Sequence, residues 1–417
     1  MISKKIEHIA IKTKQASYEL TTLDTRHKNR VLKELAVQIH KNRAAIKKAN
    51  LKDVTEAGRK GLSAAMIDRL VLDDGRIDAM RHSVLEVAGL KDPVGEMTEQ
   101  RKRNGLHIKK VRIPLGVICM IYESRPNVTV DAASLCFKSG NAVILRGGAE
   151  AYHSNCALVG IIRDVLKKNA VDPCAVSMVP FTDRSAMIHL LQMDRYINVV
   201  IPRGGEGLMR FIGDHTKIPV IKHDKGVCSL FVDESADILK AVRVIENAKV
   251  QRPGVCNALE QLYVHKKIAA KFLPEFYRAM TADHVEIRGD HQTRKIIPAI
   301  KLATDKDFGT EYLDLILAVK VVTDVRDAIS HVIRYSSDHT DGIITKNKKN
   351  AGLFARAINS SCVMINTSTR FNDGGELGLG AEIGIATTRL HAYGPMGLRE
   401  LTAQKFVVES DYRIRGG

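Results

Sequence analysis

The stretch NAVILRGGAEAYHSNCALVGIIRDVLKKNAVDPCAVSMVPF, residues 141–181, decides the fold. It begins with an apolar run that ends in two glycines, continues with apolar residues at helical spacing over 155–169, and ends with a second apolar run at 175–181. A short apolar run bounded by glycine is typical of a buried strand, and a period near 3.6 is typical of a helix. A strand, a helix and a second strand in this order predict a right-handed crossover in a parallel sheet.

The same alternation continues toward the C-terminus in two series. The first adds strands expected at 197–205, 218–223 and 228–233, with helices at 184–193 and 206–215. The second has strands expected at 258–265, 314–322, 342–345 and 362–366, with helices at 267–280, 324–335 and 350–358. The fold class expected is therefore α/β, with two doubly wound parallel-sheet domains.

Segments outside the two series have other patterns. Residues 1–100 show apolar positions at helical spacing, whereas 106–114 and 405–414 alternate apolar and polar residues as strands do. The two alternating segments predict a small β extension whose open edge favours a homo-oligomer, at least a dimer. We expect an NADP-binding domain at 1–240, a catalytic domain at 241–385, and a C-terminal segment at 386–417 that returns to the cofactor domain.

The composition indicates a globular protein and narrows its partners. The chain has 417 residues and a formal net charge of +17, which raises the alternative of a non-enzymatic RNA-binding protein. The basic excess is spread out, Trp is absent, and only 5% of residues are aromatic, so no nucleic-acid partner is expected. No apolar run reaches about 18 residues, and the charged start lacks the apolar core of a signal peptide. We expect a cytoplasmic location and no membrane partner.

The seven cysteines are scattered, odd in number and without a CxxC pair. This excludes a framework made only of disulfides within the chain, and it argues against a metal site. Most of them are expected to be small buried hydrophobes. Cys256, in QRPGVCNALEQLYVH at 251–265, lies between a Pro-Gly turn and an expected strand. It is either a packed thiol or a nucleophile held on a loop at the edge of a sheet.

Two turns after strands could bind a nucleotide. Gly204 and Gly205 precede an expected helix, where backbone N–H groups favour phosphate, although a tight turn explains them equally well. Arg146 ends another strand and could meet a phosphate or ribose. A nucleotide site and a cysteine together suggest an oxidoreductase that works through a thiohemiacetal, which needs an oxyanion donor. Asn127, after a strand and a proline, could be that donor or could cap the next helix.

Several segments of the chain resemble segments of a known enzyme superfamily. VRIPLGVICMIYESRPNVT at 111–129 and TEYLDLILAVKVV at 310–322 resemble segments of the aldehyde dehydrogenase superfamily. Within it, the chain resembles the γ-glutamyl phosphate reductase, or glutamate-5-semialdehyde dehydrogenase, family. The matching stretches run in the expected order from about residue 107 to residue 400, at 121–148, 251–260, 328–345 and 374–398.

The resemblance assigns roles to individual residues. It implies that Cys256 is the nucleophile and that Asn127 is the oxyanion-binding amide. The cofactor-binding residues that it implies are Arg146, Gly204, Gly205 and Glu311. The candidates for binding the anionic groups of the substrate are Arg125, Arg252 and Arg370, each of which could instead be a surface or structural arginine.

The resemblance also implies the reaction. It is the NADPH-dependent reduction of L-glutamyl 5-phosphate to L-glutamate 5-semialdehyde with release of phosphate, the second step of proline biosynthesis, with glutamate 5-kinase as pathway neighbour. His223 stands where hydrolytic relatives have a water-activating Glu, in the gapless alignment of HDKGV at 223–227. That departure favours the phosphate-linked reaction over the alternative, an ordinary NAD(P)-dependent oxidation of another aldehyde.

Overall fold

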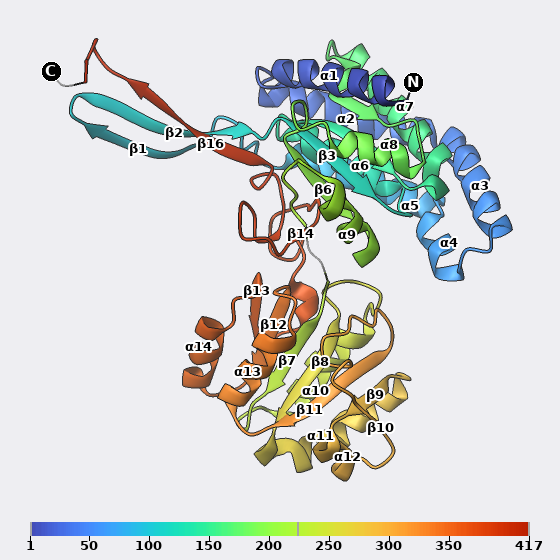
Figure 1. Cartoon of the computed structure of the whole chain (residues 1–417), viewed down its shortest axis with the longest axis vertical. Helices are drawn as coiled ribbons and strands as arrows, with labels where there is room; N and C mark the ends of the chain where they lie inside the picture. The colour runs from blue at the N-terminus through green and yellow to red at the C-terminus, as the bar shows by residue number, and fades with distance from the viewer. Residues whose placement is uncertain (1, 223–224, 416–417) are drawn as a thin grey trace. The chain divides into compact units, whose positions relative to one another are not determined.

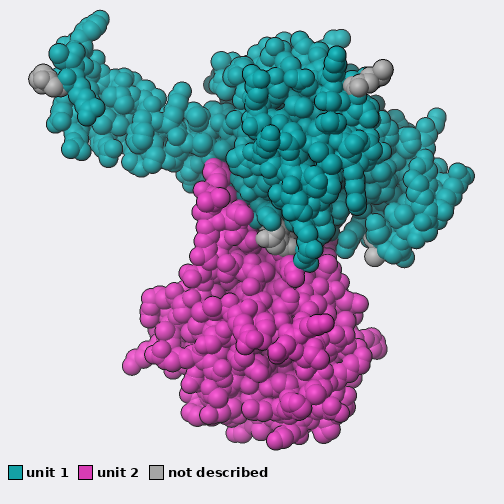
Figure 2. Space-filling view, viewed as in Figure 1, with its two compact units in different colours: residues 1–222, 379–384, 396–417 teal, residues 223–378, 385–395 magenta. Residues whose placement is uncertain are grey.

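The computed structural model describes residues 2–222 and 225–415, which form two compact units (Figure 2). Unit 1 comprises Met1–Lys222, Leu379–Gly384 and Met396–Gly417, and unit 2 comprises His223–Gly378 and Ile385–Pro395. The change of unit thus falls before the expected boundary at residue 240. The reason is that β7 (Cys228–Val232) pairs in parallel with β8 (Leu259–His265), so it belongs to the sheet of unit 2.

Unit 1 contains a four-stranded parallel sheet in the order β5-β4-β3-β6. Its strands are β3 (Val117–Tyr122), β4 (Ala142–Gly147), β5 (Val176–Met178) and β6 (Val199–Arg203). The helices between and after them are α6 (Asn127–Lys138), α7 (Tyr152–Lys168), α8 (Arg184–Leu191) and α9 (Glu206–His215), with the 3-10 turns η1 (Ala149–Ala151) and η2 (Pro173–Ala175). The expected strand at 218–223 is reduced to one bridge, between Val220 and Val200.

Residues 2–89 are mostly helical, as their periodicity predicts, whereas residues 97–100, also expected to be helical, lie in the strand β1 (Met97–Arg103). The helices are α1 (Ile2–Leu20), α2 (Thr25–Lys41), α3 (Arg43–Arg59), α4 (Ala64–Leu70) and α5 (Asp74–Gly89). In α2 the apolar side chains at helical spacing, Val31, Leu35 and Ile39 among them, are buried. The Asp24 carboxylate caps its N-terminus by accepting the His27 N–H at 2.7 Å. The lysines and arginines of this region lie mostly on exposed faces.

Unit 2 contains a seven-stranded parallel sheet in the order β10-β9-β11-β8-β7-β12-β13. Besides β7 and β8, its strands are β9 (Glu286–Gly289), β10 (Lys301–Leu302), β11 (Ile316–Val322), β12 (Thr340–Ile344) and β13 (Cys362–Ile365). Its helices are α10 (Ile238–Val250), α11 (Lys266–Ala282), α12 (His291–Ile296), α13 (Val325–Tyr335) and α14 (Lys348–Ala357), with the 3-10 turn η3 (Thr369–Phe371). Sequence reasoning missed β9, β10 and α12, which are short.

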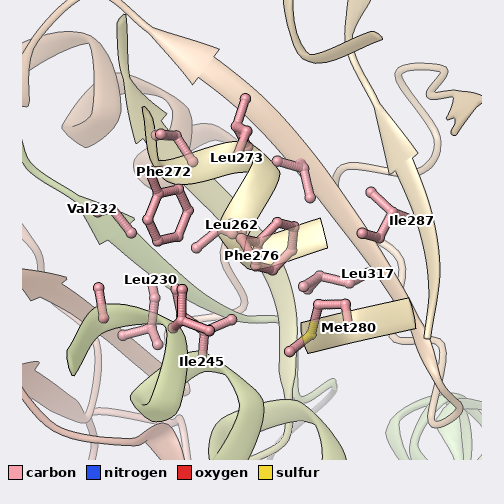
Figure 3. Packing of buried hydrophobic residues seen from close by; sticks show 14 of the residues in the cluster. Leu230, Val232, Ile245, Leu262, Phe272, Leu273, Phe276, Met280, Ile287 and Leu317 are labelled. Atoms are coloured by element: carbon pink, nitrogen blue, oxygen red, sulfur yellow. The ribbon is translucent and has the colours of Figure 1, made fainter. Parts of the chain in front are cut away.

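The largest apolar cluster of unit 2 lies between this sheet and the helices α10 and α11. Phe272 and Phe276 of α11 are fully buried, and their rings stack with centroids 5.7 Å apart. In Figure 3 Phe276 lies beside Leu262 of β8. This packing fixes α10 and β8, the two elements that flank the Cys256 loop.

A separate three-stranded antiparallel sheet belongs to unit 1; the alternating segments predict two of its strands, and the third, at residues 97–103, was not predicted. Its order is β1-β2-β16, formed by β1 (Met97–Arg103), β2 (Leu106–Pro114) and β16 (Thr402–Glu409). Figure 1 shows it extending away from the helices of its unit. The β1–β2 turn is Asn104-Gly105, whose φ values of 50° and 74° suit the tight turn of a hairpin.

The glycine-rich C-terminal region is divided between the units. A short hairpin of β14 (Ile385–Ala386) and β15 (Gly394–Pro395) belongs to unit 2. The remainder returns to unit 1, where the Leu401 carbonyl accepts the Asn141 side-chain amide at 2.9 Å. Within residues 2–222 and 225–415, no helix is both long and apolar enough to span a membrane.

Candidate active site

In unit 1, five of the predicted site residues lie at the carboxyl edge of the four-stranded sheet. Arg125 and Asn127 follow β3, Arg146 is the penultimate residue of β4, and Gly204 and Gly205 follow β6. The strand order reverses between β3 and β6, because β4 and β5 continue on the other side of β3. Ligands of open α/β sheets bind at such a switch point, beyond the carboxyl ends of the strands.

Arg146 is held at this edge by one hydrogen bond, and another of its N–H groups has no partner. Its Nη2 donates to the Thr182 carbonyl at 2.8 Å, whereas its Nε is buried and has no hydrogen-bond partner. Burial lowers the pKa of Arg146, and the carboxylates of Glu150, Asp183 and Glu123 act in the opposite direction. A buried guanidinium nitrogen without a partner is costly. An oxygen of a bound ribose or phosphate would satisfy it.

The Gly204-Gly205 turn contains a residue that sequence reasoning missed. The Glu123 carboxylate accepts the Gly205 N–H at 3.1 Å, so it lies at the N-terminus of α9. A Cβ on Gly204 would lie 2.6 Å from a Glu123 oxygen, so a larger residue here would have to move the end of the Glu123 side chain. A cofactor phosphate at this turn would therefore have to displace the Glu123 carboxylate or bind beside it.

The side chain of Asn127 does not cap α6. The N-cap position is Pro126, without a side-chain cap, and Asn127 Nδ2 instead donates to Asp131 Oδ2 at 2.9 Å. The same Asp131 accepts the Ser83 hydroxyl at 3.0 Å. The capping alternative is therefore wrong. An amide nitrogen carries two hydrogens, and this bond uses one of them to orient the group.

The loop between β3 and Asn127 is tied down by another residue that the sequence did not single out. Glu150 accepts both the Ser124 N–H, at 2.6 Å, and the Ser124 hydroxyl, at 2.7 Å. Ser124 has a φ of 43°, an unfavourable value for a side-chain-bearing residue. Arg125 is half-buried in the same loop, and its carbonyl accepts the Val128 N–H at 3.1 Å. A strained loop held by a carboxylate positions Asn127.

In unit 2, Cys256 lies where the sequence predicts, in the loop between α10 and β8. The loop, residues 251–258, precedes the first residue of β8, and the Cys256 side chain is partly exposed. Gly226 packs directly against its backbone, since a Cβ on Gly226 would lie 2.6 Å from Cys256 Cα. This packing explains a glycine whose role was not evident from the sequence.

Cys228, the first residue of β7, is the cysteine next to Cys256, and it is a packed thiol. Its Sγ donates to the Cys256 carbonyl at 3.1 Å and lies 3.6 Å from His339 Nδ1. Burial raises the pKa of Cys228 well above its usual value. A thiol in this state supports the Cys256 backbone and is a poor nucleophile.

A second segment, around η3, anchors the Cys256 loop. Asn257 Nδ2 donates to the Asn372 carbonyl at 3.0 Å, and Arg370 Nη1 donates to Asn257 Oδ1. Arg370 Nε also donates to Gln251 Oε1 at 2.9 Å. Asn372 Nδ2 in turn donates to Thr340 Oγ1, at the start of β12, at 2.7 Å. The loop is therefore fixed on both sides of Cys256.

Two arginines predicted to bind substrate come together near Cys256. Burial is the main cause that lowers the pKa of Arg370, and the nearby Arg252 guanidinium lowers it further. The charge of Cys256 acts on Arg370 in the opposite direction, so thiol and guanidinium lie within range of each other. A cavity of about 220 Å³ opens here, lined by Asn247, Gln251, Arg370, Phe371, Asp373 and Glu376. The two guanidiniums favour an anionic substrate, and the carboxylates of Asp373 and Glu376 on the same lining limit the net positive charge.

Glu311 lies in the loop before β11 and not within a strand, because β11 begins only at Ile316. It is half-buried, and its charge raises the pKa of Glu260 in β8. It therefore lies at the same edge of the sheet as the Cys256 loop. His223 lies outside the described residues.

The site residues thus fall into two sets, one in each unit. Unit 1 holds Arg125, Asn127, Arg146, Gly204 and Gly205, and unit 2 holds Arg252, Cys256, Glu311 and Arg370. The first set can bind a nucleotide and donate to an oxyanion. The second can supply a cysteine nucleophile and positive charge for an anionic substrate.

Comparison with known proteins shows close relatives of the whole chain. The model of the aldehyde dehydrogenase family matches residues 2–308. A γ-glutamyl phosphate reductase from Geotalea daltonii is 50% identical over 415 residues, which is 99% of each chain. The crystal structure of the γ-glutamyl phosphate reductase from Thermotoga maritima has a TM-score of 0.97 at 47% identity, covering 98% of this chain and 99% of that one.

More distant structures share the fold. A glyceraldehyde-3-phosphate dehydrogenase from Methanocaldococcus jannaschii, solved with NADP, has a TM-score of 0.70 at 15% identity, covering 98% of this chain and 95% of that one. At that identity the likeness concerns the fold alone. The aldehyde dehydrogenase-like fold is thus confirmed.

Proposed function

Since the chain belongs to the aldehyde dehydrogenase family and, within it, to the γ-glutamyl phosphate reductases, we propose that it reduces L-glutamyl 5-phosphate to L-glutamate 5-semialdehyde with NADPH, releasing phosphate. This is the reductase step of proline biosynthesis from glutamate, and glutamate 5-kinase is the proposed pathway neighbour. The observation that carries the proposal is the 50% identity over 99% of both chains. The placement of Cys256 on an anchored loop near Arg370 supports it.

The first step assigned to the chain is attack by Cys256. Its thiolate adds to the acyl carbon of the substrate, and the bond from that carbon to the phosphate oxygen breaks. Inorganic phosphate departs, and the acyl group remains on Cys256 as a thioester. Arg252 and Arg370 are the proposed partners of the phosphate, because two neighbouring guanidiniums suit an anion with several charges. Arg125 is the third candidate for binding the substrate.

The second step is reduction of the thioester. Bound NADPH supplies the hydride, and the residues proposed to hold it are Arg146, Gly204, Gly205 and Glu311. The buried, unpartnered Nε of Arg146 fits such a ligand. The Asn127 amide and the Cys256 N–H are proposed to hold the oxyanion that forms at the carbonyl oxygen. When the oxyanion of this thiohemiacetal collapses, the bond from carbon to sulfur breaks, which releases the semialdehyde and restores the Cys256 thiolate.

The thioester must survive long enough to be reduced. We propose that water attacks it slowly because His223 replaces the Glu that activates water in hydrolytic relatives. Help from a general base is typically worth 10²–10⁴-fold, so its absence leaves phosphate as the preferred acyl acceptor in the reverse direction. A histidine can itself act as a base near neutral pH, so the point needs a direct test.

The test is NADP⁺ reduction by glutamate semialdehyde with and without inorganic phosphate. We expect turnover that depends on phosphate, and a His223→Glu variant that gains activity without phosphate. Comparable wild-type rates in phosphate-free buffer would contradict the proposal and identify an ordinary aldehyde-oxidising dehydrogenase. Repeating the assay with NAD⁺ measures the preference for NADP.

A further inference from the structure

A fully buried ion pair joins the two ends of the Cys256 loop. Lys249, in the last turn of α10, and Glu260, the second residue of β8, lie with Nζ 2.7 Å from Oε2, and both side chains are 0% exposed. A buried pair of this kind adds little net stability compared with apolar side chains of the same volume. Stability alone therefore does not account for it.

The second oxygen of Glu260 contacts another part of the site. Its Oε1 accepts the Leu313 N–H at 3.1 Å. Leu313 has a φ of 55°, a conformation that costs free energy for a residue with a side chain and persists only where neighbours impose it. Glu311 lies two residues before Leu313, so the bond from Glu260 constrains residues 311–313, which are called the Glu311 segment below.

The charges around Glu260 agree with this arrangement. Burial is the main cause that raises the pKa of Glu260 to about 7, Lys249 and the Leu313 N–H act in the opposite direction, and the Glu311 carboxylate adds to the increase. Asp314 in turn acts on Lys249. The ion pair, Glu311 and Asp314 therefore lie within range of one another at one edge of the sheet.

We propose that Glu260, held in place by Lys249, is a positioning residue whose single carboxylate fixes the Cys256 loop and the Glu311 segment in one geometry. This inference rests on the proposed function, because it assigns the Glu311 segment to the cofactor. With the carboxylate in place, the Cys256 loop and the Glu311 segment keep a fixed position relative to each other. Without it, each relaxes separately, and a displacement near 1 Å costs about 10²-fold in rate.

Two double variants separate the two bonds without leaving an uncompensated charge. Lys249→Met/Glu260→Met removes the ion pair and the acceptor for Leu313, whereas Lys249→Met/Glu260→Gln removes the ion pair but keeps an acceptor. The control is Asp233→Asn. Asp233 is a fully buried carboxylate at the carboxyl end of β7, whereas Glu260 lies at the amino end of β8, and Asp233 accepts the Thr345 hydroxyl at 2.6 Å. For each protein we would measure the melting temperature, the Kd for NADPH without substrate, and kcat.

We expect the Met/Met variant to bind NADPH at least tenfold more weakly and to lose at least 30-fold in kcat, at a melting temperature no lower than that of the control. The Met/Gln variant should keep its Kd within threefold of wild type and lose about tenfold in kcat. A folded Met/Met variant with Kd and kcat within threefold of the control would overturn the proposal.

If the Met/Met variant does not fold, the Met/Gln variant decides alone, and an unchanged kcat would overturn the proposal. Failure of the proposed function gives a different pattern. The wild type would then bind NADPH but show no phosphate-dependent turnover, while the Kd comparison would still report on the bond to Leu313.

Discussion

At the scale of single residues, Cys256 has an environment that its neighbour in the fold, Cys228, lacks. Cys256 is partly exposed, whereas Cys228 is buried and packs under the Cys256 carbonyl. Cys256→Ala should abolish turnover and leave NADPH binding nearly intact, since the loop is anchored through the neighbouring Asn257. Cys362→Ala, a half-buried thiol in the same unit, is the control and should retain full activity. A Cys256→Ala enzyme with more than about a tenth of the normal rate, a loss under about 1.4 kcal/mol, would exclude it as the nucleophile.

Ser83 is a suitable comparison for Asn127, because both side chains donate a hydrogen bond to Asp131. Asn127→Ala removes the proposed oxyanion donor and should lower kcat by about 10²-fold or more, with little change in cofactor affinity. Ser83→Ala removes the other hydrogen bond to Asp131 and is expected to change kcat by less than threefold. Measuring kcat and melting temperature on both variants separates the roles. Equal losses of kcat would mean that Asn127 acts only through the structure around Asp131.

At the scale of elements, the segment from β10 to β11 depends on a buried carboxylate. Burial of Asp307 opposes its ionisation, but hydrogen bonds from Arg288, Thr304 and Tyr312 outweigh it and hold the pKa of this carboxyl well below its usual range. A lowered pKa means that ionised Asp307 stabilises the fold above its unfolded pKa of about 3.9, and that this contribution is lost as the pH falls.

We therefore expect Asp307→Asn to lower the free energy of unfolding by about 2 kcal/mol at pH 7, the scale of hydrogen bonds to a charged group. The difference from wild type should narrow as the pH falls from about 4 toward 2. Urea unfolding at several pH values measures it, with the exposed neighbour Asp305→Asn as control. A difference that stays constant over this pH range would show that the ionised form contributes nothing.

The elements also show what the sequence could and could not predict. The Cys256 loop was predictable because a Pro-Gly turn and an apolar run bound it on both sides. The roles of Gly226 and Glu123 were not, because each depends on a contact with a residue distant in sequence, Cys256 or Gly205. Lys249 and Glu260 could not be distinguished from ordinary surface charges, because the residues around each of them in the sequence do not indicate that the ion pair is buried.

At the scale of the whole molecule, the β1-β2-β16 sheet presents apolar side chains that its own unit leaves exposed. Phe406 and Val408 of β16 are 57% and 54% exposed on an edge strand. Because open edges and exposed apolar groups favour association, we expect a homo-oligomer, at least a dimer. The molar mass measured by light scattering at micromolar concentration should exceed the 46.1 kDa of one chain.

The same sheet offers a variant that tests the interface. Phe406→Glu/Val408→Glu should shift the protein toward the monomer mass, whereas Lys405→Glu, which alters charge but no apolar side chain, should not. A wild type that scatters as a single chain would contradict the expectation.

The division of the chain between the units has a consequence for the order of synthesis. Residues 223–378, most of unit 2, are consecutive, but unit 1 also needs residues 379–384 and 396–417. During translation the helices and four-stranded sheet of unit 1 leave the ribosome first, yet β2 has no β16 beside it and Asn141 no Leu401 carbonyl until the last residues are made. The nascent chain therefore carries an open strand edge through the synthesis of all of unit 2, a state prone to mispairing with another chain. A premature stop near residue 395 would accordingly damage the first unit made and spare the second.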